Sequence, residues 1–265
     1  MTAPRYIGLD LAWSERNRSG GAVLVAEEPG RVRLVAASGL LGSDSELLDF
    51  VAAHLPDGAP AVIGVDAPLW VPNATGRRRC DHEVSLAFRK EEAGAYPGNR
   101  QLLAKEGSIR GERLAQALAG RFGVETALPV PRHGVGRYLA EIFPHPAHIR
   151  LFGLSLTLKY KRKAGRSEAM LAAEFARYQQ LLLGLATAHP ALDGHQTLCS
   201  TPFAPLRRRA QKALEDATDA LTCAYVAAYI HYHGPAGQQI FGSVAEGHIL
   251  VPVAPGVVGK ESIPS

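Results

Sequence analysis

Four aspartates stand out because each lies beside or within an apolar stretch of the sequence. Asp10 and Asp66 each follow a short apolar run. Asp216 and Asp219 lie three positions apart in a late, alanine-rich stretch. Burying several carboxylates together raises their pKa values unless cations offset their repulsion. An all-oxygen set of this kind suits Mg²⁺ or Mn²⁺, so the four residues predict a metal site that hydrolyses phosphodiester bonds.

Each aspartate has a predicted task in a two-metal mechanism. We expect two ions about 3.5–4 Å apart, which activate a water and stabilise the leaving oxygen. Asp10 would bridge or anchor both ions, and Asp66 would hold one of them. Asp216 and Asp219 share one face of a helix at this spacing and would hold the other ion.

Glu141 and His145 are two further candidates for the catalytic site, and each has a plainer alternative. Glu141 is an acid among apolar neighbours, so it either joins the metal shell or pairs with an arginine. His145 lies between two prolines. It serves either as a general base or proton shuttle near neutral pH, or as the partner of a backbone carbonyl in a turn.

The elements that would position these residues follow from the apolar pattern and the turn residues. Ser43 and Glu46 have the spacing of a capping box at the start of a helix. Residues 61–66 form a continuous apolar run, as in a strand buried on both faces. Asp66 should therefore lie at the carboxyl end of a strand, where α/β folds place ligands. The predicted strands cover residues 6–13, 20–26, 31–38, 61–66 and 137–143, with a short strand pair or loop over 241–253; the predicted helices cover 44–55, 81–90, 101–122, 167–185 and 209–232.

This order of elements predicts an α/β protein with a ribonuclease H-like, mixed five-stranded sheet and flanking helices. In that arrangement the first strand is central and the fourth lies beside it, which brings Asp10 and Asp66 together. Residues 73–135 are richer in Arg, Glu and Gly and read as an inserted helical lobe. We expect residues 1–265 to form a single domain that carries this lobe.

Basic residues form three patches, although the net charge of +4 is too small to identify a polyanionic partner by itself. The alternative for each patch is an ordinary solvent-exposed loop or helix end without a binding role. Combined with an acidic metal site, the patches favour nucleic acid as the partner, DNA or RNA, with phosphates bound outside the acid cluster. The predicted contacts are Arg79, Lys159, Tyr160, which could stack on a base, Lys161, Arg166 and Arg208.

Composition excludes several classes of protein. The chain has 265 residues, of which 46% are hydrophobic and 20% charged. Its apolar runs fall short of the roughly 20 residues of a membrane span, and its start lacks a signal-peptide core, so we expect a cytoplasmic protein. Three widely spaced cysteines give no zinc pattern and fit a reduced compartment. No glycine-rich phosphate loop or serine nucleophile elbow occurs.

Aromatic residues beside the predicted strand ends are open to two interpretations. Trp13, Trp70 and Tyr96 could stack on bases. Aromatic side chains in such places more often close the core, and we expect that role for them.

Several motifs resemble known families. The stretch 216–221 resembles the acidic helix motif of RuvC-type Holliday-junction resolvases, and residues 7–10 are similar to their first strand. Asp66 stands where those enzymes typically carry Glu, which shortens the ligand arm. The wider pattern resembles domain-of-unknown-function family 429, whose members are described as predicted nucleases of ribonuclease H-like fold. The motifs that carry this resemblance are 7–13, 64–69, 141–145, 160–161 with Arg166, 216–221 and 247–252.

Two functions follow from these observations. The first is a Mg²⁺- or Mn²⁺-dependent nuclease or nuclease-like phosphohydrolase. The second is a non-catalytic, regulatory protein of the same fold that binds a nucleotide or a partner protein, because fold similarity does not fix function.

Overall fold

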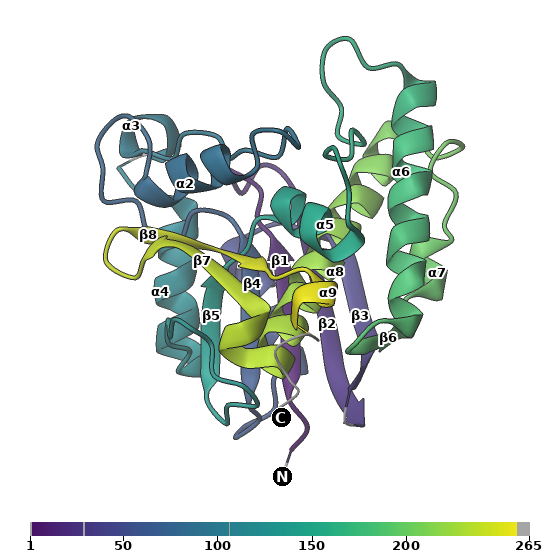
Figure 1. The fold of residues 1–265 in the computed structure, drawn as a ribbon. Coiled ribbons are helices and arrows are strands. Elements are labelled where there is room, and N and C mark those ends of the chain that lie inside the picture. Colours follow the sequence, from purple (N-terminus) through teal and green to yellow (C-terminus); the bar gives the residue numbers. More distant parts are fainter. Residues whose placement is uncertain (1, 29, 106, 259–265) are drawn as a thin grey trace.

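The computed structural model describes residues 2–28, 30–105 and 107–258. Its centre is a mixed six-stranded sheet in the order β5-β4-β1-β2-β3-β6, and β7 and β8 form a separate hairpin (Figure 1). The strands are β1 (Arg5–Asp10), β2 (Ser19–Glu28), β3 (Arg31–Leu41), β4 (Ala61–Asp66), β5 (Arg137–Glu141), β6 (Ala191–Asp193), β7 (Gln238–Ser243) and β8 (Gly247–Pro252).

Helices cover both faces of the sheet, and two short 3₁₀ helices, η1 and η2, follow the two longest α-helices. None of the helices in the described ranges is both long and apolar enough to cross a membrane. The helices are α1 (Asp44–His54), α2 (Arg79–Ala87), α3 (Arg100–Leu103), α4 (Arg110–Phe122), α5 (Pro144–Phe152), α6 (Glu168–Leu183), η1 (Gly184–Thr187), α7 (Gln196–Cys199), α8 (Arg208–His233), η2 (Gly234–Gly237) and α9 (Pro255–Val258).

The pairing of β1 positions the first two acids. β1 pairs with β2 antiparallel and with β4 parallel, and Asp10 is the register partner of Asp66. β5 pairs parallel with the other side of β4. The predicted central first strand with the fourth strand beside it is therefore confirmed, and the two aspartates meet at one edge of the sheet.

The sheet has six strands, so the predicted number of five is wrong. The additional strand, β6, pairs parallel with β3 in a segment for which the sequence predicts no strand. It has only three residues, which is too short for an alternating pattern, and Pro190 and Gly194 flank it. Arg31 of β3 donates to Asp193 of β6 at 2.6 Å.

Two other predicted boundaries differ from the structure. The helix expected over 101–122 is interrupted: α3 ends at Leu103, α4 begins at Arg110, and Gly107 between them has a φ of 79°, which favours glycine. The turn expected around His145 is the first turn of α5, with Pro144 at its start. Proline fits there because the first amides of a helix have no partner within the helix.

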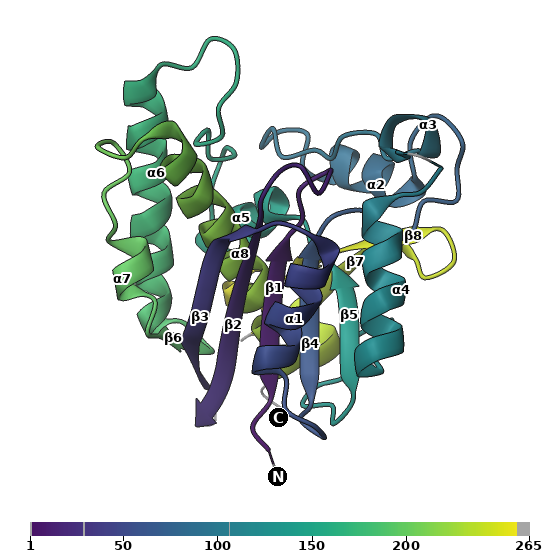
Figure 2. The same cartoon turned by 180° about the vertical axis from the view of Figure 1, so that it is seen from behind.

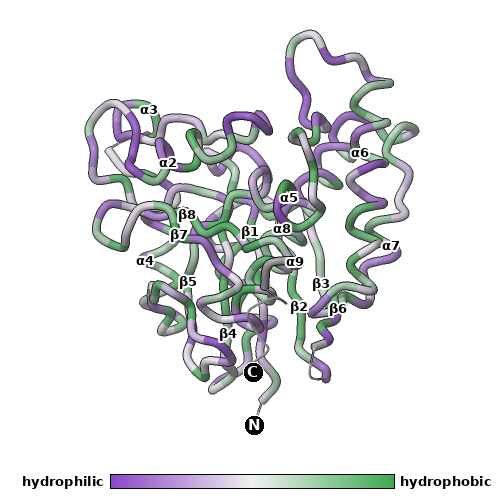
Figure 3. The backbone as a smooth tube through the Cα atoms, in the orientation of Figure 1, coloured by the Kyte–Doolittle hydropathy of each residue, from purple (hydrophilic) through white to green (hydrophobic). Residues whose placement is uncertain are grey.

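Two hydrophobic cores lie on opposite faces of the sheet. On one face, α1 and α4 cover β1, β2 and β4 (Figure 2). Leu47 of α1 and Leu114 of α4 belong to the core on this face. On the other face, α8 crosses the sheet and packs with α6 (Figure 1). The central strands are largely hydrophobic, whereas the loop that leads into α6 is largely hydrophilic (Figure 3).

Within residues 73–135, predicted as an inserted lobe, the helices pack in two places. α4 belongs to the layer that covers the sheet together with α1. α2 instead packs against the β7–β8 hairpin, where Phe88 meets Phe241. Of the two alternatives predicted for residues 241–253, a strand pair or a loop, this hairpin confirms the strand pair, and its first strand begins earlier, at Gln238.

Glycines in three neighbouring strands allow α8 to lie directly on the sheet. A Cβ atom at Gly8 of β1 would lie 1.9 Å from the carbonyl oxygen of Ala220, and one at Gly20 of β2 would lie 2.0 Å from that of Asp216. At Gly39 of β3 the corresponding distance to the oxygen of Ala213 is 1.7 Å. A side chain at any of these positions would push the helix away, so the glycines set the distance between α8 and Asp10 of β1.

Candidate functional site

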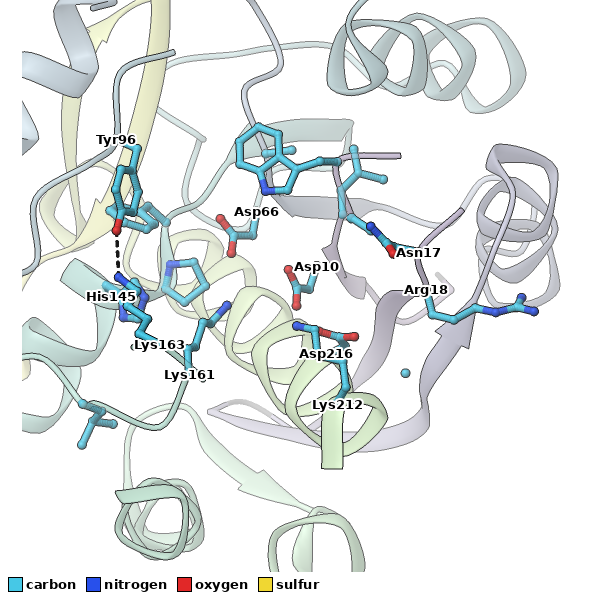
Figure 4. Close-up of a pocket in the computed structure, with 18 of the residues that line it drawn as sticks. Asp10, Asn17, Arg18, Asp66, Tyr96, His145, Lys161, Lys163, Lys212 and Asp216 are labelled. Atoms are coloured by element: carbon cyan, nitrogen blue, oxygen red, sulfur yellow. Dashed lines mark hydrogen bonds and ion pairs between the residues drawn. The ribbon is translucent and has the colours of Figure 1, made fainter. Parts of the chain in front are cut away.

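Three acids from separate elements face one cavity. The carboxylates of Asp10, at the end of β1, Asp66, at the end of β4, and Asp216, on α8, turn toward the same space (Figure 4). The cavity has a volume of about 1220 Å³ and lies beyond the carboxyl ends of the strands. Loop residues 11–18, residues 92–96 and residues 157–166 form much of its wall.

The fourth acid, Asp219, lies behind this wall and is fully buried. Lys161 Nζ lies 2.7 Å from Asp219 Oδ2, and the hydroxyls of Tyr160 and Tyr178 donate to Oδ1 at 2.6 and 3.3 Å. Burial opposes ionisation of Asp219, but the Lys161 ammonium and these donors outweigh it and hold the pKa of Asp219 below its ordinary value. Asp219 is therefore a charged anchor for Lys161.

Asp216 is held by a lysine on its own helix. Lys212 Nζ donates to Asp216 Oδ1 at 2.6 Å and to Glu215 Oε1 at 2.8 Å. Asp216 Oδ2 is buried without a hydrogen-bond partner among the described residues. Burial and the nearby Asp10 carboxylate raise the pKa of Asp216 to about 8, although Lys212 opposes the shift. This oxygen favours a proton or a cation as its partner.

The acids at the strand ends are perturbed in the same direction. Burial raises the pKa of Asp10, and Lys161 only partly offsets this effect. Burial and the charge of Asp10 raise the pKa of Asp66 well above its ordinary value. Burial by itself would lower the pKa of the Lys161 ammonium, but the negative charges of the nearby acids have the larger effect and raise this pKa. Lys161 and Lys212 thus offset only part of the effect that burial and mutual repulsion have on the pKa values of Asp10, Asp66 and Asp216.

The acids of the site stand too far apart to share one ion as they are placed. In residues 2–28, 30–105 and 107–258, no group of three His, Cys, Asp or Glu side chains is spaced to hold one ion. Lys161 and Lys212 supply the positive charge beside the acids in this arrangement.

Glu141, the candidate on β5, takes part in a buried ion pair. Arg78, which is 3% exposed, donates to its two oxygens at 2.6 and 2.8 Å and also to Asp81 at 2.8 Å. The amide of Leu69 donates to Glu141 at 2.9 Å. These contacts match the alternative in which Glu141 pairs with an arginine of residues 73–135. They connect α2 to the end of β5.

His248 of β8 completes this buried group and leads to a prediction about pH. The amide of Glu141 donates to His248 Nε2 at 3.2 Å, and burial together with Arg78 lowers the pKa of His248 to about 4. In the unfolded chain the His248 side chain has a pKa near 6.5, so between pH 6.5 and pH 4 the unfolded state binds more protons than the folded state. The contribution of His248 to the free energy of unfolding is therefore lost as the pH falls from 6.5 toward 4. We expect this residue to contribute a loss of about 2 kcal/mol in unfolding free energy between pH 7 and pH 5.

Urea unfolding of the native chain and of His248→Gln at pH 7 and pH 5 checks this expectation. Buried acids with raised pKa values, such as Asp66, act in the opposite direction, so the informative quantity is the difference between the two proteins. Equal changes with pH in both proteins would contradict a buried, neutral His248.

His145 lines the cavity, and its Nδ1 lies 3.2 Å from the hydroxyl of Thr157. Burial and the charge of Lys161 lower the pKa of His145 to about 3. The ring is therefore neutral near pH 7 and can accept a hydrogen bond from water. So low a pKa makes it a weak proton acceptor, because general bases work best near the operating pH.

The six predicted nucleic-acid contacts have three different outcomes. Lys159, Lys161, Arg166 and Arg208 line the cavity. Arg79 lies outside this lining and pairs with Glu83 at 2.7 Å and with Glu246 at 3.5 Å. Tyr160 is fully buried, so its ring has no free face for a base, contrary to the prediction. The ring packs beneath Lys161. Its position among lysines in the sequence gives no sign of this burial.

Comparison with protein-family models gives one assignment. Residues 8–243 match the model described as "Protein of unknown function (DUF429)". The chain belongs to the DUF429 family. Comparison with curated proteins and with solved structures found no match. In this DUF429 chain, the matched range contains all four aspartates and the residues that line the cavity between Asp10 and Asp216.

Some residues at the site of this DUF429 chain were not among the predicted site residues. Lys212 lies four positions before Asp216 and three before Glu215, a helical spacing that could have identified it as their partner. Trp13 and Tyr96 also line the cavity and are 63% and 73% exposed, so they do not close the core as expected. Their exposure depends on the path of two loops, which no local pattern specifies.

Proposed function

We propose that the chain is a metal-dependent hydrolase of phosphodiester bonds in nucleic acid, with a ribonuclease H-like fold. The observation that carries the proposal is the meeting of Asp10, Asp66 and Asp216 at one cavity (Figure 4). The order of β1 to β5 in the sheet supports the fold assignment. Ligand sites of open α/β sheets lie beyond the carboxyl ends of the strands, where these acids are found.

The type of donor fits a divalent cation. Carboxylate oxygens are the ligands that Mg²⁺ and Mn²⁺ prefer, and Asp216 Oδ2 is a buried oxygen without a hydrogen-bond partner in the described chain. Because no three acidic side chains of the described chain already stand at metal spacing, binding requires them to turn toward each other. Bound there by Asp10, Asp66 and Asp216, which line the cavity, such an ion would supply Lewis-acid polarisation of the phosphate.

The lysines of the site have tasks of their own in this proposal. Lys161 is held by Asp219 and points toward Asp10 and Asp66 (Figure 4). Its ammonium can neutralise a phosphate oxygen brought beside the acids. His145, neutral and on the same wall, can orient a water by accepting a hydrogen bond. We assign His145 this positioning task because of its low pKa.

The cavity wall supports a polyanionic substrate. Nine basic and four acidic side chains line it, so the wall carries more positive than negative charge. A surplus of positive charge in a concave site concentrates anions such as phosphodiesters. The basic lining residues are Arg16, Arg18, Lys159, Lys161, Lys163, Arg166, Arg208, Arg209 and Lys212.

Cleavage of labelled single- and double-stranded DNA and RNA in Mn²⁺ and in Mg²⁺ tests the proposal. We expect Asp10→Asn to lower the cleavage rate at least about a hundredfold, which is the scale of losing one charge-stabilising group at a reacting centre. Asp57→Asn is the matched control, because Asp57 is exposed in the loop before β4. Cleavage by Asp10→Asn at the native rate would exclude the site.

A second function is favoured by one observation. Lys161 and Lys212 already lie on Asp219 and Asp216, so the acids bind cationic side chains without any ion. A protein that binds a nucleotide or nucleic acid without cutting it would use this arrangement unchanged. Absence of cleavage with every substrate, together with phosphate-dependent binding, would favour this function over the hydrolase.

A further inference from the structure

Two exposed aromatic side chains lie on the wall of the basic cavity. Trp13 belongs to the loop that follows β1, three positions after Asp10, and Tyr96 belongs to the segment between α2 and α3. Large aromatic side chains usually bury most of their area in a core or an interface. Trp13 makes no hydrogen bond or ring contact with the described part of the chain, so its indole is left to solvent at the cavity.

Tyr96 is connected to the basic loop across the cavity. Lys163 Nζ donates to the Tyr96 hydroxyl at 2.8 Å and lies 5.2 Å from the ring centre (Figure 4). The ammonium thus lies at the hydroxyl end of the ring. Because most of Tyr96 is exposed, the ring keeps area for contact with a planar ligand. The arrangement places a stacking surface and a phosphate-binding cation side by side.

Several cations of the same cavity have no carboxylate partner among the described residues. Among the described residues, five of the nine basic side chains of the cavity form no ion pair: Arg16, Lys163, Arg166, Arg208 and Arg209. Arg166 donates to the carbonyl oxygen of Lys161 at 2.7 Å, which holds the basic loop in place. Cations beside stacking rings bind a chain of phosphates and bases, whereas cations without rings bind any polyanion.

We propose that the cavity binds an unpaired nucleic-acid strand, with bases stacked on Trp13 and Tyr96 and phosphates on the cations of residues 159–166 and 208–212. The rings favour an unpaired strand over a duplex, because duplex bases already stack on both faces. This inference rests on the proposed function, because the hydrolase proposal places the phosphodiester beside Asp10, Asp66 and Asp216. It adds the form of the nucleic acid that binds there. Base–aromatic stacking contributes about 1–3 kcal/mol per base and depends little on sequence.

The chain has two tryptophans, which permits a direct test. Trp70 is 47% exposed, lies outside the cavity lining and donates from Nε1 to the carbonyl oxygen of Ala245 at 2.7 Å. In Trp70→Phe, tryptophan emission reports Trp13 alone. Titration in EDTA, where metal-dependent cleavage does not occur, is expected to quench this emission with an oligothymidylate of roughly ten nucleotides. A strand of equal length made of abasic units is expected to quench little.

Affinity provides the second measurement. By fluorescence anisotropy of an end-labelled oligothymidylate, we expect Trp13→Ala and Tyr96→Ala each to weaken binding about tenfold. Trp70→Phe should bind as the native chain does. Native melting temperatures in the variants would show that they fold. Native affinity in both alanine variants would overturn the proposal.

Other outcomes have defined meanings. Equal binding of the abasic strand, tighter binding of a duplex, or equal binding of thymidine monophosphate would each overturn the proposal. Cleavage of nucleic acid with no quenching of Trp13 would refute the stacking and leave the hydrolase standing. Base-dependent quenching without cleavage in Mg²⁺ or Mn²⁺ would support the stacking and exclude the hydrolase.

Discussion

Replacing Arg78 with methionine is expected to lower the free energy of unfolding by about 3–5 kcal/mol. Arg78 is buried between Glu141 and Asp81 and bonds to both carboxylates. Methionine fills much of the same volume but leaves two buried acids without their cation. Burial already raises the pKa of Glu141, and loss of the opposing Arg78 charge would raise it further. Urea unfolding near pH 7 measures the change.

The neighbouring arginine provides a matched control for this experiment. Arg79 pairs with Glu83 one turn along α2 and is exposed, so Arg79→Met should lower the free energy of unfolding far less than Arg78→Met does. Adding Glu141→Gln to Arg78→Met should recover part of the loss, because one unpaired charge is removed. Similar losses for Arg78→Met and Arg79→Met would contradict the buried ion pair.

Gly8→Ala is expected to destabilise the chain by about 4 kcal/mol, a large effect for one added methyl group. The new Cβ would lie 1.9 Å from the carbonyl oxygen of Ala220 and 2.3 Å from the amide nitrogen of Ala224. Both atoms belong to the backbone of α8, so no side chain can turn aside to relieve the overlap. The helix or the strand must move, and Asp216 moves with the helix.

Gly120 of α4 is the control for the glycine substitution. A Cβ at Gly120 would meet no atom within 4 Å, and alanine favours a helix by about 1 kcal/mol over glycine. Gly120→Ala should therefore stabilise the chain slightly, whereas Gly8→Ala destabilises it. Thermal unfolding followed by circular dichroism compares the two. Unchanged stability in Gly8→Ala would contradict the close packing of α8 on β1.

Local patterns in the sequence predicted the elements that carry the acids. Apolar runs located β1 and β4, and Ser43 before α1 does accept a hydrogen bond from the amide of Glu46, although the Glu46 carboxylate accepts from the amide of Gly42 instead of that of Ser43. The three-residue strand β6 has too few side chains to show a period. Gly107 and Pro144 changed the boundaries of helices in ways that depend on the backbone at single positions.

The partners of the acids were harder to predict than the acids. Asp216 pairs with Lys212 on the same helix, which spacing alone could have shown. Asp219 pairs with Lys161, 58 positions earlier in the sequence, and that contact depends on how the loop before α6 folds back. The exposure of Trp13 likewise depends on tertiary structure. Short-range patterns carry no information about such contacts.

Asp10 and Asp66 occupy facing positions in β1 and β4, and this pairing affects which parts of the site can change between related chains. Parallel strands lie about 4.8 Å apart, and this interval is set by backbone hydrogen bonds. The separation of the two acid-bearing backbones therefore does not depend on any loop. Insertions or substitutions in the segments after these strands can alter which ligands enter while the pair of carboxylates keeps its spacing.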